Sequence, residues 1–267
     1  MTAPMFYISA EQMQALAAGS VFELRGAEGK HALVKRMELG EEISLGDGSG
    51  AYAHGTVDAI LPDGVAVRVE TLGIEVPAPA TYLVQALAKD GRDLLGIETA
   101  TELGVAGVVP WSADRSIVRW KGDRAAKAHA KWENTVYAAA KQSRRALIPT
   151  VYDLHSSVEL AEFIAQVTAP AEGSEQSDSA IPEAAVFILH ENATERLSTQ
   201  LSALVSSENL PAEIYVIVGP EGGIAPREVE LFTQAGARLA LLGTEVLRAS
   251  TAGSAALCVL NTVTGRF

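Results

Sequence analysis

From Thr81 onward, stretches typical of β-strands alternate with stretches typical of α-helices. The strand-like stretches are short apolar runs rich in Val and Ile, and the helix-like stretches repeat apolar residues every three or four positions. Strands are expected at 81–87, 105–111, 185–190, 214–219 and 237–243, and helices at 94–104, 125–143, 156–167 and 250–263. This alternation predicts an α/β fold, in which helices cover a mostly parallel sheet.

The first part of the chain, residues 1–74, has a different pattern. Its apolar runs are short and broken by Gly and Asp, and GDGSG (46–50) and PDG (62–64) are turn signals. AVRVETL (66–72) alternates apolar and polar residues, as a half-buried strand does. These features predict a small β-barrel over 1–74, followed by a second domain over 75–267 that begins with a proline-bearing linker.

Composition restricts the class of protein. Hydrophobic residues make up 48% of the 267 residues, which fits a folded globular chain. The N-terminus lacks the basic and apolar regions of a signal peptide, and no apolar run approaches the length of a membrane span. The single cysteine, Cys258, is expected to be a small core residue, and the polar stretch 168–183 is expected to be a surface loop. A cytoplasmic protein is therefore expected.

The charge of the chain is unevenly distributed. Its formal net charge is −12, yet the window 114–145 contains nine basic and three acidic residues. Phosphate binding depends on the local field, which salt screens over about 8–10 Å, so this basic window is a candidate surface for nucleic acid despite the negative net charge. A solvated helix face is the alternative. Trp120 and Trp132 lie inside the window and favour a surface on which bases or sugars could lie.

Three expected strands end in residues suited to binding a ligand, at 189–191, 218–223 and 242–244. Ligands of parallel sheets bind at the carboxyl ends of strands, and the glycines of VGPEGG let a ligand reach the main chain. This loop matches neither the GxGxxG pattern nor a P-loop, and a tight turn without a ligand is the alternative. The His190 side chain is expected in a surface loop. The five histidines lack metal-ligand spacing, so no metal is expected.

Several motifs resemble one known family. VGPEGGI (218–224) and LLGTEVLRASTAGSAAL (241–257) look like the closing motifs of the SPOUT-class RNA methyltransferases. The resemblance is closest to the RsmE family, which methylates N3 of a uridine in 16S ribosomal RNA. Further segments similar to that family are HALVKRMELGEEISLGDGSG (31–50), TELGV (101–105), DRSIV (114–118) and AAKQSRRALIP (139–149). The resemblance therefore covers nearly the whole chain.

The resemblance implies a PUA-like N-terminal barrel that docks RNA, and a C-terminal SPOUT domain with a deep trefoil knot that binds S-adenosylmethionine. It also implies a homodimer that acts on 16S ribosomal RNA, either free or in the assembled small subunit. The chain departs from the family pattern at Glu98-Thr99, around Pro4-Met5-Phe6 and at Ser250. The alternative functions are a SPOUT enzyme that methylates a ribose hydroxyl of another RNA, and a non-catalytic RNA-binding protein.

Most of the expected site residues lie on the motifs that match the family or in the basic window. Those expected to bind the cofactor are Leu189, Val218, Gly219, Pro220, Gly222, Gly223, Leu242, Gly243, Leu247, Arg248, Ser250, Thr251 and Ala252. Those expected to bind RNA are Arg25, Lys35, Arg36, Arg115, Arg119, Lys121, Arg124, Lys127, Lys141 and Arg145. Because methyl transfer is an in-line displacement, positioning of the two reactants supplies much of the rate.

Four residues are candidates for the catalytic step, namely Arg115, Arg144, Glu221 and Arg248. Uracil N3 must lose a proton, and the resulting anion needs nearby donors, which Arg115 and either Arg144 or Arg145 could supply. Glu221 either orients its loop by accepting main-chain hydrogen bonds, which is the favoured interpretation, or acts as an acid or base. Arg248 has either a structural or a substrate role.

Overall fold

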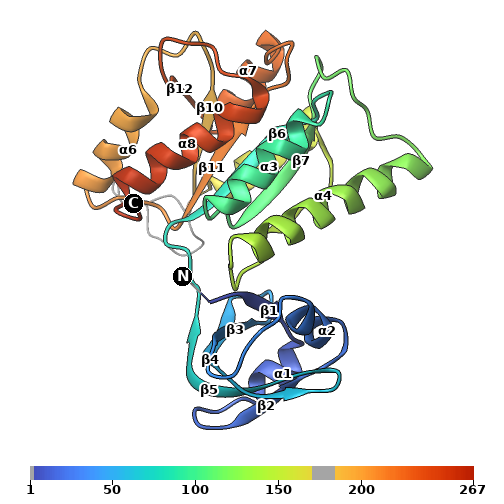
Figure 1. Ribbon diagram of the computed structural model, residues 1–267. Helices are drawn as coiled ribbons and strands as arrows, with labels where there is room; N and C mark the ends of the chain where they lie inside the picture. The colour runs from blue at the N-terminus through green and yellow to red at the C-terminus, as the bar shows by residue number, and fades with distance from the viewer. Residues whose placement is uncertain (1–2, 170–183) are drawn as a thin grey trace. The chain divides into compact units, whose positions relative to one another are not determined.

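The computed structural model describes residues 3–169 and 184–267, so most of the polar stretch 168–183 lies outside the described residues. The chain forms two compact units (Figure 1). The N-terminal unit comprises Met1–Val76 and Tyr137–Ile148, and the C-terminal unit comprises Pro77–Val136 and Pro149–Phe267. The inclusion of Tyr137–Ile148 in the N-terminal unit was not anticipated from the sequence.

The N-terminal unit is built on a five-stranded sheet in the order β1-β3-β4-β5-β2. Its elements are β1 (Met5–Tyr7), α1 (Ala10–Gln14), β2 (Val21–Leu24), α2 (Gly26–Val34), β3 (Glu42–Gly46), β4 (Ala51–Leu61) and β5 (Gly64–Ile74). β1 pairs with β3 in parallel, and the other neighbours are antiparallel. GDGSG connects β3 to β4 and PDG connects β4 to β5, so both predicted turns are confirmed. Because β1 and β2 lie at opposite ends of this order, the sheet is a half-barrel, and the predicted closed barrel is not shown.

Glu75, which follows β5, holds the segment Tyr137–Ile148 within the N-terminal unit. Its Oε1 lies 3.2 Å from Arg145 Nη2, and its Oε2 accepts hydrogen bonds from the backbone N–H groups of Ala146 and Leu147 at 2.8 and 3.0 Å. Tyr7 adds a hydrogen bond from its hydroxyl to the Arg145 carbonyl at 2.8 Å. The carboxylate satisfies buried main-chain donors that have no ladder partner here, so this segment is part of the fold of the unit.

The C-terminal unit contains the alternating part of the chain. Its elements are β6 (Ala80–Ala86), α3 (Arg92–Glu102), β7 (Gly107–Ser112), α4 (Asp123–Gln142), β8 (Thr150–Val151), β9 (His155–Ser156), α5 (Ser157–Val167), β10 (Ala184–Leu189), α6 (Leu197–Ser206), β11 (Glu213–Val218), α7 (Pro226–Gln234), β12 (Arg238–Ala240) and α8 (Ala249–Val263). α4 begins in this unit, and its last residues, from Tyr137, belong to the N-terminal unit.

The sheet of the C-terminal unit has the strand order β12-β10-β11-β6-β7-β8, and β9 also pairs with β7. All of these pairs are parallel, which confirms the predicted parallel sheet and α/β class. α5 and α7 pack on one face through Leu160, Ile164 and Phe232. α3 and α8 lie side by side on the other face, with α6 beside α8 (Figure 1). The carboxyl ends of β10, β11 and β12 therefore meet at one edge of the sheet.

Helix ends follow the sequence signals closely. Ser156, at the start of the helix expected over 156–167, caps α5 in a capping box with Glu159. Gly104 follows the end of α3 with a φ of +92°, a conformation that favours glycine. Cys258 was predicted to lie in the core, but it is exposed on α8, because it falls on the outer side of that helix. No helix in the described part of the chain combines the length and apolarity that crossing a membrane requires.

Candidate functional site

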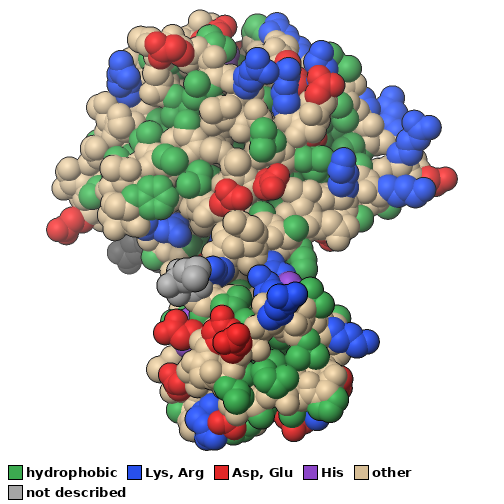
Figure 2. Space-filling model, in the orientation of Figure 1, with side chains coloured by type: hydrophobic (Ala, Val, Ile, Leu, Met, Phe, Trp, Pro, Cys, Tyr) green, Lys and Arg blue, Asp and Glu red, His purple; other side chains and the backbone are tan. Residues whose placement is uncertain are grey.

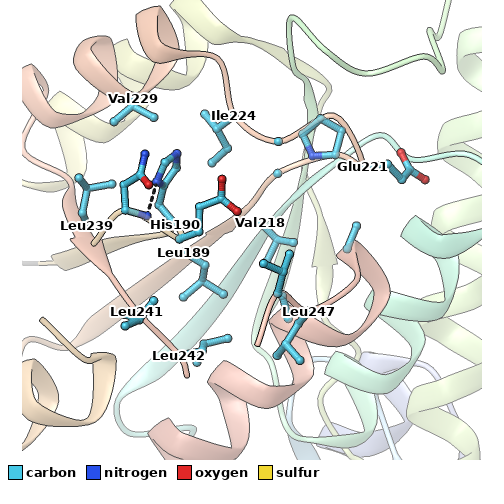
Figure 3. A pocket seen from close by; sticks show the side chains of 18 of the residues that line it. Leu189, His190, Val218, Glu221, Ile224, Val229, Leu239, Leu241, Leu242 and Leu247 are labelled. Carbon is cyan, nitrogen blue, oxygen red and sulfur yellow. Dashed lines mark hydrogen bonds between the residues drawn. The ribbon is translucent and has the colours of Figure 1, made fainter. Parts of the chain in front are cut away.

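A cavity of about 950 Å³ opens where β10, β11 and β12 end. Its floor is apolar and includes Leu189, Val218, Leu239, Leu241 and Leu242, which converge on the cavity in Figure 3. Strand ends at this edge leave main-chain groups without ladder partners, and those groups are available to a ligand. The site thus combines apolar surface for a flat group with main-chain donors and acceptors around it.

Charged side chains surround this floor. The arginines that line the cavity are Arg92, Arg115 and Arg248, and the glutamates are Glu191, Glu221, Glu230 and Glu245. Such a rim can balance a ligand that carries both a cationic and an anionic group. Among the described residues, no group of three or more His, Cys, Asp or Glu is arranged to hold a metal ion.

The loop Gly219–Ile224 packs tightly against its surroundings. A β-carbon at Gly219 would lie 2.6 Å from Ile224 Cγ1, and one at Gly222 would lie 3.0 Å from Arg115 Cβ and 3.3 Å from the Arg115 carbonyl oxygen. Gly223 has a φ of +71°, which a residue with a side chain rarely adopts. The glycines are therefore needed for the packing of the loop itself, in addition to the ligand access expected from the sequence.

Two arginines hold this loop from the elements that precede it along the sheet. Arg115, after β7, donates from Nη1 to the Gly222 carbonyl oxygen at 3.0 Å. Arg92, the first residue of α3, lies 3.4 Å from Glu221 through its Nη1. Glu221 Oε1 also accepts a hydrogen bond from the backbone N–H of Lys89 at 3.2 Å, and its side chain points away from the apolar floor in Figure 3. Glu221 thus anchors its loop to the residues that follow β6.

A buried carboxylate follows Arg92 in the chain. Asp93, in the first turn of α3, is 6% exposed and accepts a hydrogen bond from the backbone N–H of Leu94 at 2.9 Å. Burial raises the pKa of Asp93, and the hydrogen bonds from Leu94 and from the Trp132 side chain oppose that shift. Trp132 had been expected to offer a surface on which bases or sugars could lie. It is only 2% exposed, so it belongs to the core instead.

The structure brings most of the predicted cofactor residues together at the cavity. Those that line it are Leu189, Val218, Gly219, Pro220, Gly222, Gly223, Leu242, Gly243, Leu247, Arg248 and Ala252. Ser250 and Thr251 do not, since Ser250 is buried in the first turn of α8 and Thr251 is exposed beside it. Of the four catalytic candidates, Arg115, Glu221 and Arg248 line the cavity, whereas Arg144 belongs to the N-terminal unit. The roles assigned to all these residues remain predictions.

Sequence reasoning missed several residues that line the cavity. Arg92 is one, and its signal was a basic residue in the segment AKDGR (88–92), which follows the strand TYLVQAL at a fourth strand end of the same edge. Asn192 and Glu245 lie directly after two of the strand ends that had been singled out, and Glu191 lies inside one of them but had not been named as a site residue. His190 lies in the loop after β10, as expected, and its half-buried ring also lines the cavity, where its Nδ1 accepts a hydrogen bond from the Asn192 N–H at 3.1 Å.

The basic window divides into exposed and engaged residues. Lys121, Arg124 and Lys127 are exposed around the beginning of α4, where Figure 2 shows Lys and Arg side chains gathered. Arg119 is also exposed, but its guanidinium donates to the Ala113 and Asp114 carbonyl oxygens at 2.7 and 3.0 Å. The exposed group is therefore a candidate surface for phosphates.

The remaining predicted RNA-binding residues belong to the N-terminal unit. Lys35 and Arg36 are exposed and lie directly after α2. Arg25 is half exposed and pairs with Glu23 and Asp63. Lys141 lies 2.5 Å from Glu28, and both side chains are 19% exposed. The Arg145 side chain is 7% exposed and pairs with Glu75, so its charge is directed into the unit rather than toward solvent.

Comparison with known proteins identifies the family. The profile of the RNA methyltransferase domain matches residues 75–261. The chain belongs to this RNA methyltransferase family. It is similar to the ribosomal RNA small subunit methyltransferase E of Mycobacterium bovis, with 38% identity over 93% of this chain and 89% of that protein. The cavity is therefore the candidate active site of an RNA methyltransferase.

Solved structures of methyltransferases share the fold. One is the ribosomal RNA small subunit methyltransferase E of Neisseria gonorrhoeae bound to S-adenosylmethionine, with a TM-score of 0.75, 25% identity and coverage of 98% of both chains. Another is a methyltransferase of Legionella pneumophila in complex with the same cofactor, with a TM-score of 0.71, 25% identity and coverage of 98% of both chains.

The residues of this cavity fit that cofactor. Its volume of about 950 Å³ is at the upper end of the range of about 300–1,000 Å³ for small-molecule sites. S-adenosylmethionine has an adenine that suits the apolar floor and strand-end main chain, and cationic sulfonium and ammonium groups that suit Glu191, Glu221 or Glu245 on the rim. The carboxylate of the cofactor suits one of the arginines that line the cavity.

Proposed function

We propose that this RNA methyltransferase binds S-adenosylmethionine in the cavity at the ends of β10, β11 and β12 and methylates N3 of a uridine in 16S ribosomal RNA. The observation that carries the proposal is the convergence of the family motifs on one cavity, because VGPEGGI and LLGTEVLRASTAG both contribute to its lining. The small-subunit rRNA substrate is supported by the names of relatives that share up to 38% identity with this chain.

When bound, S-adenosylmethionine supplies a methyl group activated by attachment to a cationic sulfur. The residues proposed to hold it are Leu189, Val218, Leu242, Leu247 and the glycines of the 219–223 loop, through apolar contact and main-chain hydrogen bonds. Fixing the cofactor in this way contributes to the rate, because displacement requires nucleophile, methyl and leaving group to be in line. The apolar floor also excludes water and strengthens nearby electrostatic interactions.

On the acceptor side, Arg115 is the proposed residue that stabilises the uracil anion. Arg115 donates one hydrogen bond from Nη1 to the Gly222 carbonyl oxygen. Because a guanidinium has five N–H donors, others are available for the oxygens of a uracil that has lost its N3 proton. Arg248, at the N-cap of α8, is exposed at the cavity and is a second candidate for substrate contact. Glu221 already accepts a main-chain hydrogen bond from Lys89, which supports an orienting role over acid–base chemistry.

RNA docking is proposed to use the exposed basic residues of both units. Lys121, Arg124 and Lys127 contribute from the beginning of α4, and Lys35 and Arg36 contribute from the half-barrel unit, which we propose to be PUA-like. In the same proposal, residues 1–74 dock RNA and residues 75–267 form a SPOUT domain with a trefoil knot. The protein then works as a cytoplasmic homodimer. The support for these finer features is the resemblance to the family and the likeness to solved methyltransferases.

The test is methyl transfer from labelled S-adenosylmethionine to naked 16S rRNA and to assembled small subunits, followed by nucleoside mass spectrometry. We expect N3-methyluridine as the product. Label in a 2′-O-methyl nucleoside would support the ribose-directed alternative instead. Cofactor binding by calorimetry without transfer to either substrate would support a non-catalytic RNA-binding protein.

A further inference from the structure

Glu228, in the first turn of α7, is a completely buried carboxylate that does not line the cavity. Its Oε1 accepts hydrogen bonds from the backbone N–H of Asp114 at 2.7 Å and from the Ser157 hydroxyl at 2.5 Å. Its Oε2 accepts one from the backbone N–H of Ala225 at 3.0 Å. Burying a carboxylate is costly unless it is hydrogen-bonded. Here donors from three separate segments offset that cost, so the carboxylate holds those segments together.

Capping of α7 accounts for only one of these contacts. The bond from Ala225 is the usual capping-box contact between an N3 glutamate and the N-cap backbone. The bond from Asp114 is different, because it crosses to the loop after β7, and the residue that follows Asp114 is Arg115. Ser157, which begins α5, is itself held by a hydrogen bond from Trp111 Nε1 at 3.2 Å. The carboxylate therefore joins the β7 loop to α5 and α7.

The cavity residue next to these contacts of Glu228 is Arg115, which directly follows Asp114 in the chain. Its guanidinium donates to the Gly222 carbonyl oxygen at 3.0 Å, and its backbone approaches Gly222 so closely that a β-carbon there would lie 3.3 Å from the Arg115 carbonyl oxygen. The Arg227–Asp114 ion pair crosses the same two elements, but its side chains are 59% and 42% exposed and it adds little. The hydrogen bond from the Asp114 N–H to the buried Glu228 carboxylate joins the β7 loop to α7 directly beside Arg115.

We propose that Glu228 is a positioning residue for methyl transfer, which acts by holding the Asp114 N–H and so setting the place of the Arg115 guanidinium at the acceptor side of the cavity. This rests on the proposed function of Arg115. Glu228→Gln would replace one acceptor oxygen with an NH₂ group, so either Asp114 or Ala225 would lose its acceptor. Misplacement of a reacting group by about 1 Å can cost about a hundredfold in rate.

The experiment is a double-mutant cycle in full-length protein with Glu228→Gln, Arg115→Ala and the combined variant. We expect Glu228→Gln to lower kcat by about tenfold to a hundredfold, with cofactor affinity unchanged. In the Arg115→Ala background, the same substitution should change kcat by less than about twofold, because the residue through which it acts is gone. Independent, multiplicative effects would overturn the proposal, and so would a loss of cofactor affinity with kcat intact.

The matched control is Glu159→Gln. Glu159 is the N3 residue of the capping box of α5, where it accepts from the Ser156 N–H at 2.7 Å, but it is exposed and joins no further loop. We expect kcat for Glu159→Gln to stay within about twofold of wild type, as for a surface substitution. A drop equal to that of Glu228→Gln would assign the whole effect to helix capping and overturn the proposal.

Residue-resolved hydrogen exchange on the wild-type protein covers the case in which Glu228→Gln does not fold. Asp114 is exposed as a residue, so its amide should exchange slowly only if it donates to the buried Glu228 carboxylate. Fast exchange at Asp114 would overturn the proposal. This measurement needs no RNA, so it tests the positioning role of Glu228 independently of methyl transfer. Failure of the proposed methyl transfer would be seen separately, as inactivity of the wild-type protein.

Discussion

Two arginine–glutamate pairs, one in each unit, differ mainly in how far the arginine is buried. Arg92 and Glu221, at the cavity, lie 3.4 Å apart with side chains that are 29% and 18% exposed. Arg145 and Glu75, in the N-terminal unit, lie 3.2 Å apart, and the arginine side chain is only 7% exposed. Glu75 also accepts two main-chain hydrogen bonds, which commits it to the fold. Because the cavity pair is longer and its arginine is more exposed, we expect it to rearrange around a ligand at a smaller cost in stability than the Arg145–Glu75 pair.

The largest effect is expected at the glycine loop next to the cavity pair. Gly222→Val would place a β-carbon 3.0 Å from Arg115 Cβ, and overpacking of this kind costs about 1–3 kcal/mol before its γ-methyl groups are counted. The valine would have to displace the β7 loop or enter the cavity, so we expect S-adenosylmethionine binding to be abolished in a folded protein. Calorimetric titration with circular dichroism as the fold check measures this.

Gly243→Ala is the matched control for that substitution. A β-carbon at Gly243 meets only Glu245 Oε2, at 3.7 Å, which is an ordinary contact, so the free protein should fold as wild type does. Any loss of affinity in this variant reports on space that the cofactor itself occupies. Normal cofactor binding by folded Gly222→Val would show that the pocket is misplaced.

The strand ends were predictable because topology fixes where they meet. Once β10, β11 and β12 are parallel neighbours, Leu189, Val218 and Leu242 must gather at one edge, whatever the packing details. A pattern of charged residues does not determine in this way which of its members will be exposed and which buried. Arg144 and Arg145 are adjacent in sequence, yet one is exposed and the other buried against Glu75, a residue about 70 positions earlier. The contacts of Glu228 could not be predicted for the same reason, since its partners Asp114 and Ser157 come from distant segments.

Next in size is the effect of breaking the buried pair. Arg145→Ala leaves Glu75 without its cation, and we expect the N-terminal unit to lose about 2–3 kcal/mol, less than for a fully buried pair because Glu75 is 29% exposed. The control is the neighbouring Arg144→Ala, which is exposed and should change stability by no more than about 0.5 kcal/mol. Urea unfolding of both variants measures the difference. Equal stabilities would place Arg145 among the surface residues after all.

A smaller effect is expected for the exposed basic residues of α4. Reversing Lys121, Arg124 and Lys127 to Glu removes up to three phosphate contacts, so the slope of log affinity against log salt should fall in magnitude by about 2. Cofactor affinity should not change, because none of the three lines the cavity. Reversal of Arg196 and Arg238, exposed residues outside the basic window, is the control. An unchanged salt slope would assign the window to a solvated helix face.

The smallest effect is expected at the cavity pair itself. Glu221→Gln keeps an acceptor for the Lys89 N–H and loses only a long ion pair with Arg92, so we expect a change of no more than about 1 kcal/mol in cofactor binding or in the barrier to transfer. If Glu221 were a general acid or base, the same substitution would lower kcat by about 10²–10⁴-fold. Single-turnover methyl transfer at saturating cofactor distinguishes these outcomes.

The central claim is that the cavity at the ends of β10, β11 and β12 serves methylation of a uridine base in small-subunit rRNA. Its most direct test is nucleoside mass spectrometry of 16S rRNA from a strain in which the gene is deleted, with the parent strain beside it. We predict that one N3-methyluridine disappears and returns on complementation with the wild-type gene but not with Gly222→Val. An unchanged N3-methyluridine content, or the loss of a ribose methylation instead, would contradict the account.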